Sequence, residues 1–175
     1  MAKRKHIALD FEIDKLTNSI ENTLTGDRLQ TEVLPITKED LARIKKDKTW
    51  QFDWNQEYKT PKHQLFKLTI VGNPQIIQGL MCFEIMFDHV HIHLLENAKF
   101  NIGKNKIYVG VPGNLVAYAC KVSLEKGFEG NVAFVSKTKL IDHYLTMLPG
   151  SFAVGHKIIV MPSTAQSLID TYFKT

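Results

Sequence analysis

The chain has 175 residues, which is the length of one domain or of one domain with an extension. Its content of 44% apolar and 23% charged residues is that of an ordinary globular protein, and no stretch is long and apolar enough to cross a membrane. Acidic residues follow the basic N-terminus almost at once, which excludes a signal peptide, so we expect a cytoplasmic protein with no membrane contact.

The net charge of +4 suits a polyanionic small molecule and would also suit nucleic acid. The basic residues do not gather in a dense stripe, so a solvated surface explains most of them better than a nucleic-acid interface does. Lys104 and Lys106 are the pair that we link to phosphate. The two cysteines, Cys82 and Cys120, lie in apolar runs, and we expect buried free thiols rather than a disulfide or a metal site.

Residues 1–30 predict a helical extension that packs on a domain spanning residues 31–175. Over residues 10–24 apolar side chains recur three and four positions apart, which is the pattern of an amphipathic helix: Ile13, Leu16, Ile20 and Leu24. A short edge strand over residues 31–36 and a short capped helix over residues 37–44 follow.

An aromatic row comes next, within residues 48–61. The alternation of Trp50, Phe52 and Trp54 places three aromatic side chains on one face of an extended segment. They can form a flap that covers the core or a wall beside a substrate, and we favour the flap.

Three strands with short turns, over residues 65–71, 75–87 and 89–95, predict an antiparallel meander. After a loop and a central helix, the remaining pattern predicts a buried strand, a helix, two strands and a last helix, over residues 131–135, 138–148, 151–154, 157–161 and 163–173.

The loop before the central helix contains Gly110, Pro112 and Gly113, and Asn114 after them is a good N-cap residue. An apolar stripe at helical spacing then leads to Gly127, which stands where a C′ glycine belongs. Unpaired N–H groups at such a helix start favour an anion, typically a phosphate.

The order of these elements, from residue 65 to the C-terminus, resembles the acyl-CoA-binding core of the GNAT acetyltransferase superfamily. The family's loop has a Gln or Arg, two residues, Gly, one residue and then Gly or Ala. Gly110 occupies the position of the family's first glycine. Ile107 stands in place of the Gln or Arg, and Pro112 stands in place of the final Gly or Ala. The resemblance implies an α/β fold with a mixed, mostly antiparallel sheet and helices on both faces.

The resemblance also implies an acyl-CoA-dependent N-acyltransferase that moves an acetyl group from acetyl-CoA to an amine. The acceptor is not identified, and monomer and homodimer are both open. In the family the fourth strand bulges and separates from the fifth, and its exposed backbone receives the pantetheine arm. The residues expected at the cofactor are Leu94, Leu95, Val109, Gly110, Val111, Gly113, Asn114, Leu115 and Lys137, the last in place of a common Asn.

Two residues are implied for catalysis. Tyr144 lies in the helix before the sixth strand, where the family commonly has a Tyr that protonates the CoA thiolate; it is also on the apolar face of its helix, as a core tyrosine would be. Glu96 ends the fourth strand, where a general base could face the amine, with Glu84 as second choice. Surface carboxylates are the alternative for both.

His89, His91 and His93 alternate along one strand, which places three imidazoles on one face. Such a face could bind zinc or iron, but a straight strand lets only two of them converge on one ion, and we assign no metal site. Two hypotheses therefore stand beside the acyltransferase. One is a GNAT-like fold without catalysis that acts as a binding or interaction module, and the other is a metal-dependent enzyme that uses this strand.

Overall fold

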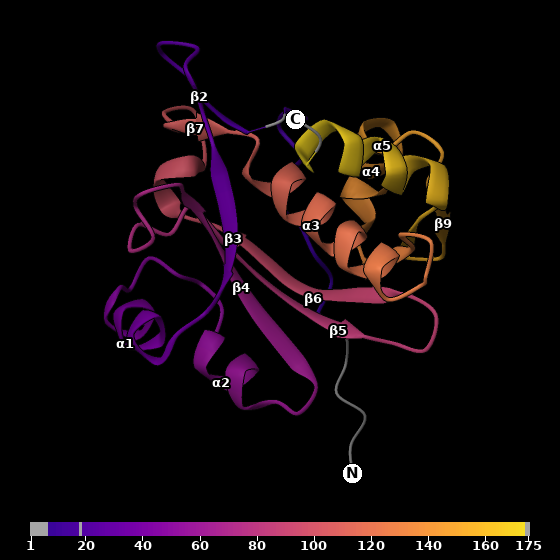
Figure 1. Cartoon of the computed structure of the whole chain (residues 1–175), viewed down its shortest axis with the longest axis horizontal. Helices are drawn as coiled ribbons and strands as arrows, with labels where there is room; N and C mark the ends of the chain where they lie inside the picture. The colour runs from indigo at the N-terminus through magenta and orange to yellow at the C-terminus, as the bar shows by residue number, and fades with distance from the viewer. Residues whose placement is uncertain (1–6, 18, 174–175) are drawn as a thin grey trace.

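The computed structural model describes residues 7–17 and 19–173 of the chain. Seven strands form one sheet in the order β3-β4-β5-β6-β8-β10-β9. Figure 1 shows β3, β4, β5 and β6 side by side. Their bounds are Thr31–Pro35 (β3), His63–Ile70 (β4), Gly79–Ile85 (β5), Val90–Asn97 (β6), Val132–Val135 (β8), Lys157–Val160 (β10) and Phe152–Val154 (β9). All neighbouring pairs are antiparallel except β6 and β8, which run parallel. The predicted mixed, mostly antiparallel sheet and its meander are therefore confirmed.

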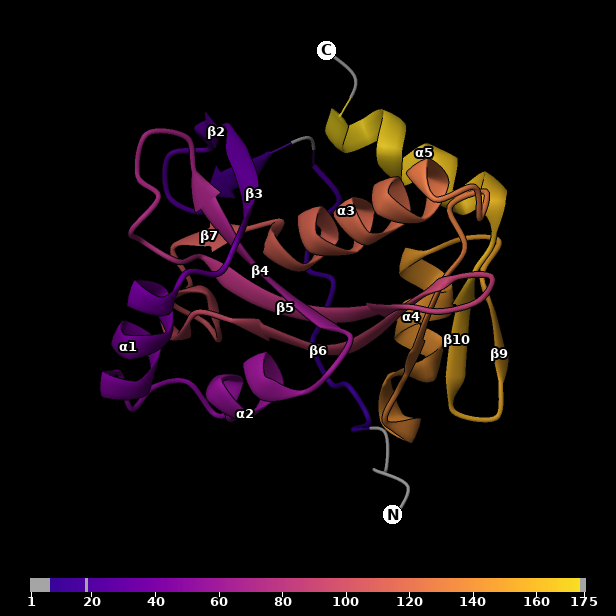
Figure 2. The same cartoon turned by 60° about the horizontal axis from the view of Figure 1, so that its bottom comes forward.

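Helices cover both faces of this sheet (Figure 2). Neighbouring residues of β4 show the two sides. Phe66 packs against Tyr118 of α3 (Val111–Glu125), with ring centroids 5.1 Å apart, whereas Lys67 forms an ion pair of 2.9 Å with Asp40 of α1. The other helical elements are α1 (Lys38–Lys46), α2 (Trp54–Lys59), η1 (Lys99–Asn101), η2 (Thr138–Leu140), α4 (Ile141–Met147) and α5 (Pro162–Phe173).

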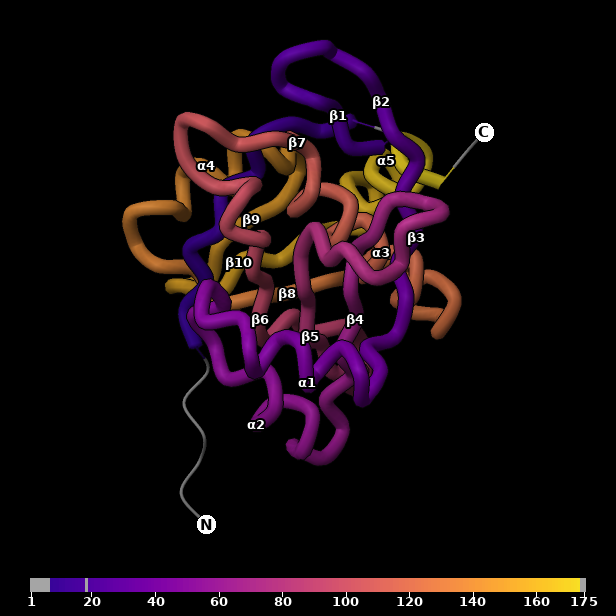
Figure 3. The backbone as a smooth tube through the Cα atoms, turned by 90° about the vertical axis from the view of Figure 1, so that its left-hand side faces the viewer, coloured from indigo at the N-terminus to yellow at the C-terminus, as the bar shows by residue number. Residues whose placement is uncertain are grey.

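A second, small sheet lies at one end of the molecule, away from α1 and α2 (Figure 3). It joins three short strands in the order β2-β1-β7, with bounds Arg28–Leu29, Ile20–Asn22 and Tyr108–Val109. Because β1 pairs with β7, the chain before β3 is tied directly to the strand that precedes α3.

The central helix α3 begins one turn earlier than the sequence predicts. Gly110 is its N-cap, in the left-handed conformation with φ of 99°, and Pro112 stands in the first turn, where its missing N–H costs nothing. Asn114 is not the N-cap. Its side chain is buried and donates to the carbonyls of Ser19 (3.2 Å) and Gly110 (2.8 Å), so it fastens the chain near β1 to the helix. Gly127 follows the C-cap Lys126 with φ of 83°, as predicted.

The predicted helix over residues 10–24 is wrong. The described part of this stretch contains no helix, and its only regular element is the strand β1. Leu9, Phe11 and Ile13 are buried, while Asp10 and Glu12 between them are exposed, which is the period of a strand. We call residues 9–17 the N-terminal segment. The boundary between extension and domain at residue 30 stays a prediction.

Candidate functional site

A gap opens in the middle of the seven-stranded sheet, between β6 and β8. Among the described residues the two strands pair only at the start of β6, at Val90 and His91. On the other edge of β6, the register against β5 shifts at His93, an extra residue between the paired Ile92 and Leu94. A bulge of this kind bends a strand and increases its twist. The bulge and the separation that the family resemblance implied are therefore confirmed.

The N-terminal segment enters this gap. The N–H of Leu9 donates to the carbonyl of Val135 (2.7 Å), and the N–H of Lys137 donates to the carbonyl of Leu9 (3.0 Å). Ser136, just after the end of β8, is the bridge partner of Leu9. Its N–H points the other way and donates to the carbonyl of His156, next to β10 (2.7 Å). Leu9 is thus on the edge that faces β6. In Figure 2 the segment, drawn in indigo, passes between β6 and α4.

Aromatic side chains hold the segment against β8 and α4. The ring of Phe11 lies 5.6 Å from that of Phe134 and 5.1 Å from that of Tyr144. The hydroxyl of Tyr144 donates to the carbonyl of Phe11, and the N–H of Ile13 donates to Nε2 of His143 (2.9 Å). Burial, helped by nearby carboxylates, raises the pKa of Tyr144, so the phenol is protonated at neutral pH. In this structure its proton fastens the segment, and its role as a general acid stays a prediction.

A carboxylate of the same segment reaches the start of α3. The N–H of Gly110 donates to Oδ1 of Asp14 (3.0 Å), and the ammonium of Lys106 lies 3.2 Å from Oδ2. An anion at this helix start was the prediction, because the first N–H groups of a helix and its dipole favour negative charge. The anion present is supplied by the chain itself.

The two glycines of the loop make room for other parts of this chain. A Cβ on Gly110 would lie 2.8 Å from Cγ2 of Thr17, and one on Gly113 would overlap the hydroxyl of Tyr172 in α5. Tyr172 in turn accepts a hydrogen bond from the N–H of Thr17 (3.1 Å). The space beside these two glycines is therefore taken, in this structure, by the N-terminal segment and α5.

The other residues expected at the cofactor are nearby but mostly covered. Leu94, Leu95, Val111 and Leu115 are buried, and Val109 is half-buried in β7. Lys137 is exposed and forms an ion pair of 2.7 Å with Asp10. Their binding role stays a prediction.

Glu96, the expected general base, is buried and fully engaged. Its carboxylate accepts hydrogen bonds from the backbone N–H groups of Gln51 (2.7 Å) and Phe52 (3.3 Å) and from Nε1 of Trp54 (2.9 Å). A carboxylate that accepts three N–H groups is well suited to anchor the chain between α1 and α2. These contacts favour a structural role for Glu96, and the assignment as base stays a prediction.

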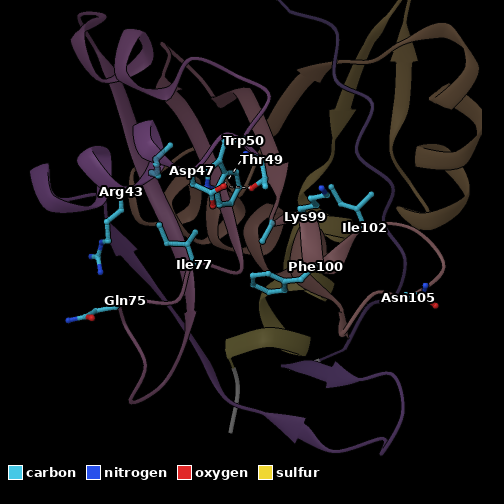
Figure 4. Close-up of a pocket in the computed structure, with 12 residues that line it drawn as sticks. Arg43, Asp47, Thr49, Trp50, Gln75, Ile77, Lys99, Phe100, Ile102 and Asn105 are labelled. Carbon is cyan, nitrogen blue, oxygen red and sulfur yellow. Dashed lines mark hydrogen bonds between the residues drawn. The ribbon is translucent and has the colours of Figure 1, made fainter.

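Two cavities flank this anchor, and the aromatic row divides between them. Trp54 begins α2 and is buried in the core, so the row is not the single extended face that we expected. Trp50 lines a cavity of about 700 Å³ (Figure 4), together with Ile44, Ile77, Phe100 and Ile102. Phe52 lines a second cavity of about 420 Å³ between the N-terminal segment and the end of β6, with Glu12, Glu96, Asn101, Ile102 and Lys106. The second cavity adjoins the gap, since Phe11 and Leu95 also line it.

The three histidines, His89, His91 and His93, do not act as one set, and His89 lies in the turn just before β6. His89 pairs with Asp88 at the exposed turn (2.7 Å), whereas Nε2 of His93 lies 2.9 Å from Oε2 of Glu84. The rings of His93 and His63 are stacked, with centroids 4.2 Å apart. His63 in β4 was not singled out from the sequence, because only the cross-strand pairing of His63 with Glu84 brings it here.

No family model and no curated protein sequence matches the chain. Solved structures do: a spermidine N-acetyltransferase SpeG mutant from Vibrio cholerae (TM-score 0.54, 13% identity, 78% of this chain and 96% of that one), AtaTR bound with AcCoA (0.53, 14%, 79% and 97%) and the ribosomal-protein-S18-alanine N-acetyltransferase from Escherichia coli (0.51, 10%, 75% and 90%). None of the described helices has the length and apolar character needed to span a bilayer. The chain therefore has the GNAT fold, in a sequence that has diverged to 10–14% identity from these structures.

Proposed function

We propose that the chain is an acyl-CoA-dependent N-acyltransferase that moves an acetyl group from acetyl-CoA to an amine. The observation that carries the proposal is the gap between β6 and β8, which leads to the glycine start of α3. Among the described residues β6 and β8 do not pair with each other beyond Val90 and His91, and the helix end at Gly110 carries a partial positive charge. An extended pantetheine arm and a pyrophosphate need these two features.

In this proposal the cofactor and the N-terminal segment compete for the gap between β6 and β8, which we call the acyl-CoA groove. The pantetheine arm runs along Leu94 and Leu95, and it meets the N-terminal segment there, because Phe11 lines the same cavity as Leu95. The pyrophosphate takes the place of the Asp14 carboxylate at the N–H of Gly110, and Lys106 exchanges one anion for the other. Gly113 and Lys137 contribute at either end of the groove once the segment has moved.

The chain's own residues then have defined tasks. Acetyl-CoA supplies a thioester whose carbonyl carbon is attacked by the amine nitrogen, so that a C–N bond forms and the C–S bond breaks. Tyr144 loses its partner, the Phe11 carbonyl, when the segment leaves, and its protonated hydroxyl gives a proton to the thiolate. Glu96 takes the amine proton, directly or through water, if its three N–H contacts loosen.

The filled groove also favours a second candidate, a GNAT-like fold that does not catalyse and serves as a binding module. In that case the N-terminal segment is a permanent part of the sheet. The replacement of the second loop glycine by Pro112, which has no N–H to donate, agrees with this candidate.

Calorimetric titration with acetyl-CoA, followed by turnover assays with a panel of amines, tests the proposal. We expect saturable binding and release of free CoA that depends on one class of amine. Binding without turnover on any amine would favour the binding module. Absence of binding at millimolar acetyl-CoA would contradict the proposed function.

A further inference from the structure

Five potential metal ligands gather on the face of the sheet that α1 and α2 cover. We call them the histidine cluster: Glu57, His63, Cys82, Glu84 and His93. They form two groups that share His63, and within each group the ligand atoms lie within 4.8 Å of one another: Glu57, His63 and Cys82 in one, and His63, Glu84 and His93 in the other.

The fold brings these residues together by cross-strand pairing. His63 of β4 is directly opposite Glu84 of β5, and Glu84 is opposite His91 of β6, so these three positions share one face. The bulge in β6 inserts His93 after that point. It turns the imidazole back toward Glu84 at 2.9 Å, and toward His63, on which it stacks.

The group of His63, Glu84 and His93 has the composition of a metal site with an open position. Two imidazole nitrogens and one carboxylate oxygen suit first-row divalent ions such as Zn²⁺, and three protein ligands leave a place for water or substrate. The side chains of His93 and Glu84 are 14% and 21% exposed, so an ion can reach them from solvent. The carboxylates of Glu57 and Glu84 beside the two imidazoles also supply the negative charge that a dication needs.

The group of Glu57, His63 and Cys82 orients the imidazole of His63, which both groups contain. Nδ1 of His63 lies 2.7 Å from Oε2 of Glu57 and 3.3 Å from Sγ of Cys82. A carboxylate that accepts the N–H of one ring nitrogen fixes the tautomer and presents the other nitrogen to the ion. Glu57 is buried with a side-chain exposure of 5%, so it holds His63 in one orientation.

From this geometry we propose that the chain binds one divalent transition-metal ion through Nε2 of His63, Nε2 of His93 and the carboxylate of Glu84. Glu57 positions His63, and Cys82 lies behind the imidazole without ligating. Binding displaces protons from the cluster, so the affinity falls as the pH is lowered. The site stands apart from the acyl-CoA groove and does not depend on the proposed function.

The test uses the full chain, stripped with EDTA and titrated with Zn²⁺ alone, then with Co²⁺ as a spectroscopic probe. We expect a stoichiometry of one and visible Co²⁺ bands of a site with nitrogen and oxygen ligands. His93→Gln and Glu84→Gln should each weaken binding by at least about a hundredfold, since loss of a supporting residue alone costs about 10–100-fold. Glu57→Gln should fall in that smaller range.

The matched control is His89→Gln, which makes the same substitution in the turn just before β6, where His89 pairs with exposed Asp88; this change should leave the affinity unaltered. Thermal unfolding in EDTA verifies that each variant is folded, and Glu84→Gln serves if His93→Gln is not. Absence of Zn²⁺ binding, or equal binding by wild type and the cluster variants, would overturn the proposal. Loss in Cys82→Ser with full binding in Glu84→Gln would overturn the ligand assignment.

Discussion

The groove between β6 and β8 and the histidine cluster lie on the same strand, β6, and differ in what satisfies their polar groups. In the groove, the partner is a distant part of the chain: the carboxylate of Asp14 accepts a hydrogen bond from the N–H of Gly110, and the carbonyl of Phe11 accepts one from the hydroxyl of Tyr144. In the cluster, the partners are neighbours in the sheet, such as Glu84 and His93.

Because of this difference, a ligand has to displace different parts of the protein in the two regions. A ligand of the groove must displace a segment that includes the buried side chains of Leu9, Phe11 and Ile13, so its binding free energy is reduced by the cost of exposing them. A ligand of the cluster has only to displace protons and to cause small movements of the side chains. We therefore expect acyl-CoA binding to respond to changes in the N-terminal segment, and metal binding to ignore them.

Locking the segment should have the largest effect. Leu9 and Ser136 are opposite each other in a parallel pair, so Leu9→Cys with Ser136→Cys permits a disulfide. In the oxidised form we expect acetyl-CoA binding to be lost, with a decrease of at least about a hundredfold, because the competing segment cannot leave. Calorimetry before and after reduction measures it.

Reduction of this variant should restore binding, which provides an internal control, and wild type treated in the same way should not change, because Cys82 and Cys120 are buried. Equal binding in the oxidised and reduced forms would place the cofactor outside the gap.

Glu96→Gln should cause the next largest effect, a loss of about 3 kcal/mol in the free energy of unfolding, because a buried charged acceptor of three N–H groups is removed. Urea unfolding measures the loss, with exposed Glu12→Gln as the control. A stable Glu96→Gln protein that loses turnover would instead support Glu96 as the base.

Tyr144→Phe should have a smaller effect on stability, about 1 kcal/mol, because one hydrogen bond to the Phe11 carbonyl is lost while the ring stays packed. The loosened segment should raise acetyl-CoA affinity by about fivefold, since 1.4 kcal/mol corresponds to tenfold. If Tyr144 is the general acid, turnover should fall by about a hundredfold in the same variant. Unchanged affinity would separate Tyr144 from the competition.

The smallest effect concerns the face that carries the cluster. Burial tends to raise the pKa of Asp40, but hydrogen bonds from the Thr37 N–H and from Lys67 outweigh it and lower the pKa below its ordinary value. The resulting stability is present above the unfolded pKa of about 3.9 and is lost as the pH falls through the lower folded value. Asp40→Asn should flatten this acid dependence in urea unfolding without changing acetyl-CoA binding. An unchanged acid profile in the variant would contradict the assignment.

Much of the fold could be predicted because local pattern and global position agree there. The stripe from Leu115 is helical and buried, and Gly127 ends it where a positive φ is needed. The helix prediction for the N-terminal segment was wrong because the local pattern and the position in the fold disagree there. Ile13, Leu16 and Ile20 have helical spacing, yet a gap in the sheet favours an extended chain. The spacing contains no information about that gap.

The site was predictable only in part. The family resemblance implied the bulge of β6, and the sequence showed the glycines before α3, although it did not predict that the helix begins at Gly110. The contact of Asp14 with Gly110 was not predicted, because these two residues are far apart in sequence. The same holds for Glu57 and His63, which join Glu84 only through strand register.

Hydrogen exchange of the backbone amides, with and without acetyl-CoA, tests most directly whether cofactor and N-terminal segment compete. The N–H groups of Leu9, Ile13 and Thr17 are hydrogen-bonded in this structure, in which the N-terminal segment fills the gap. We therefore predict that saturating acetyl-CoA speeds their exchange while the amides within α3 stay protected. Binding that leaves these three amides as protected as before, or protects them further, would contradict the account.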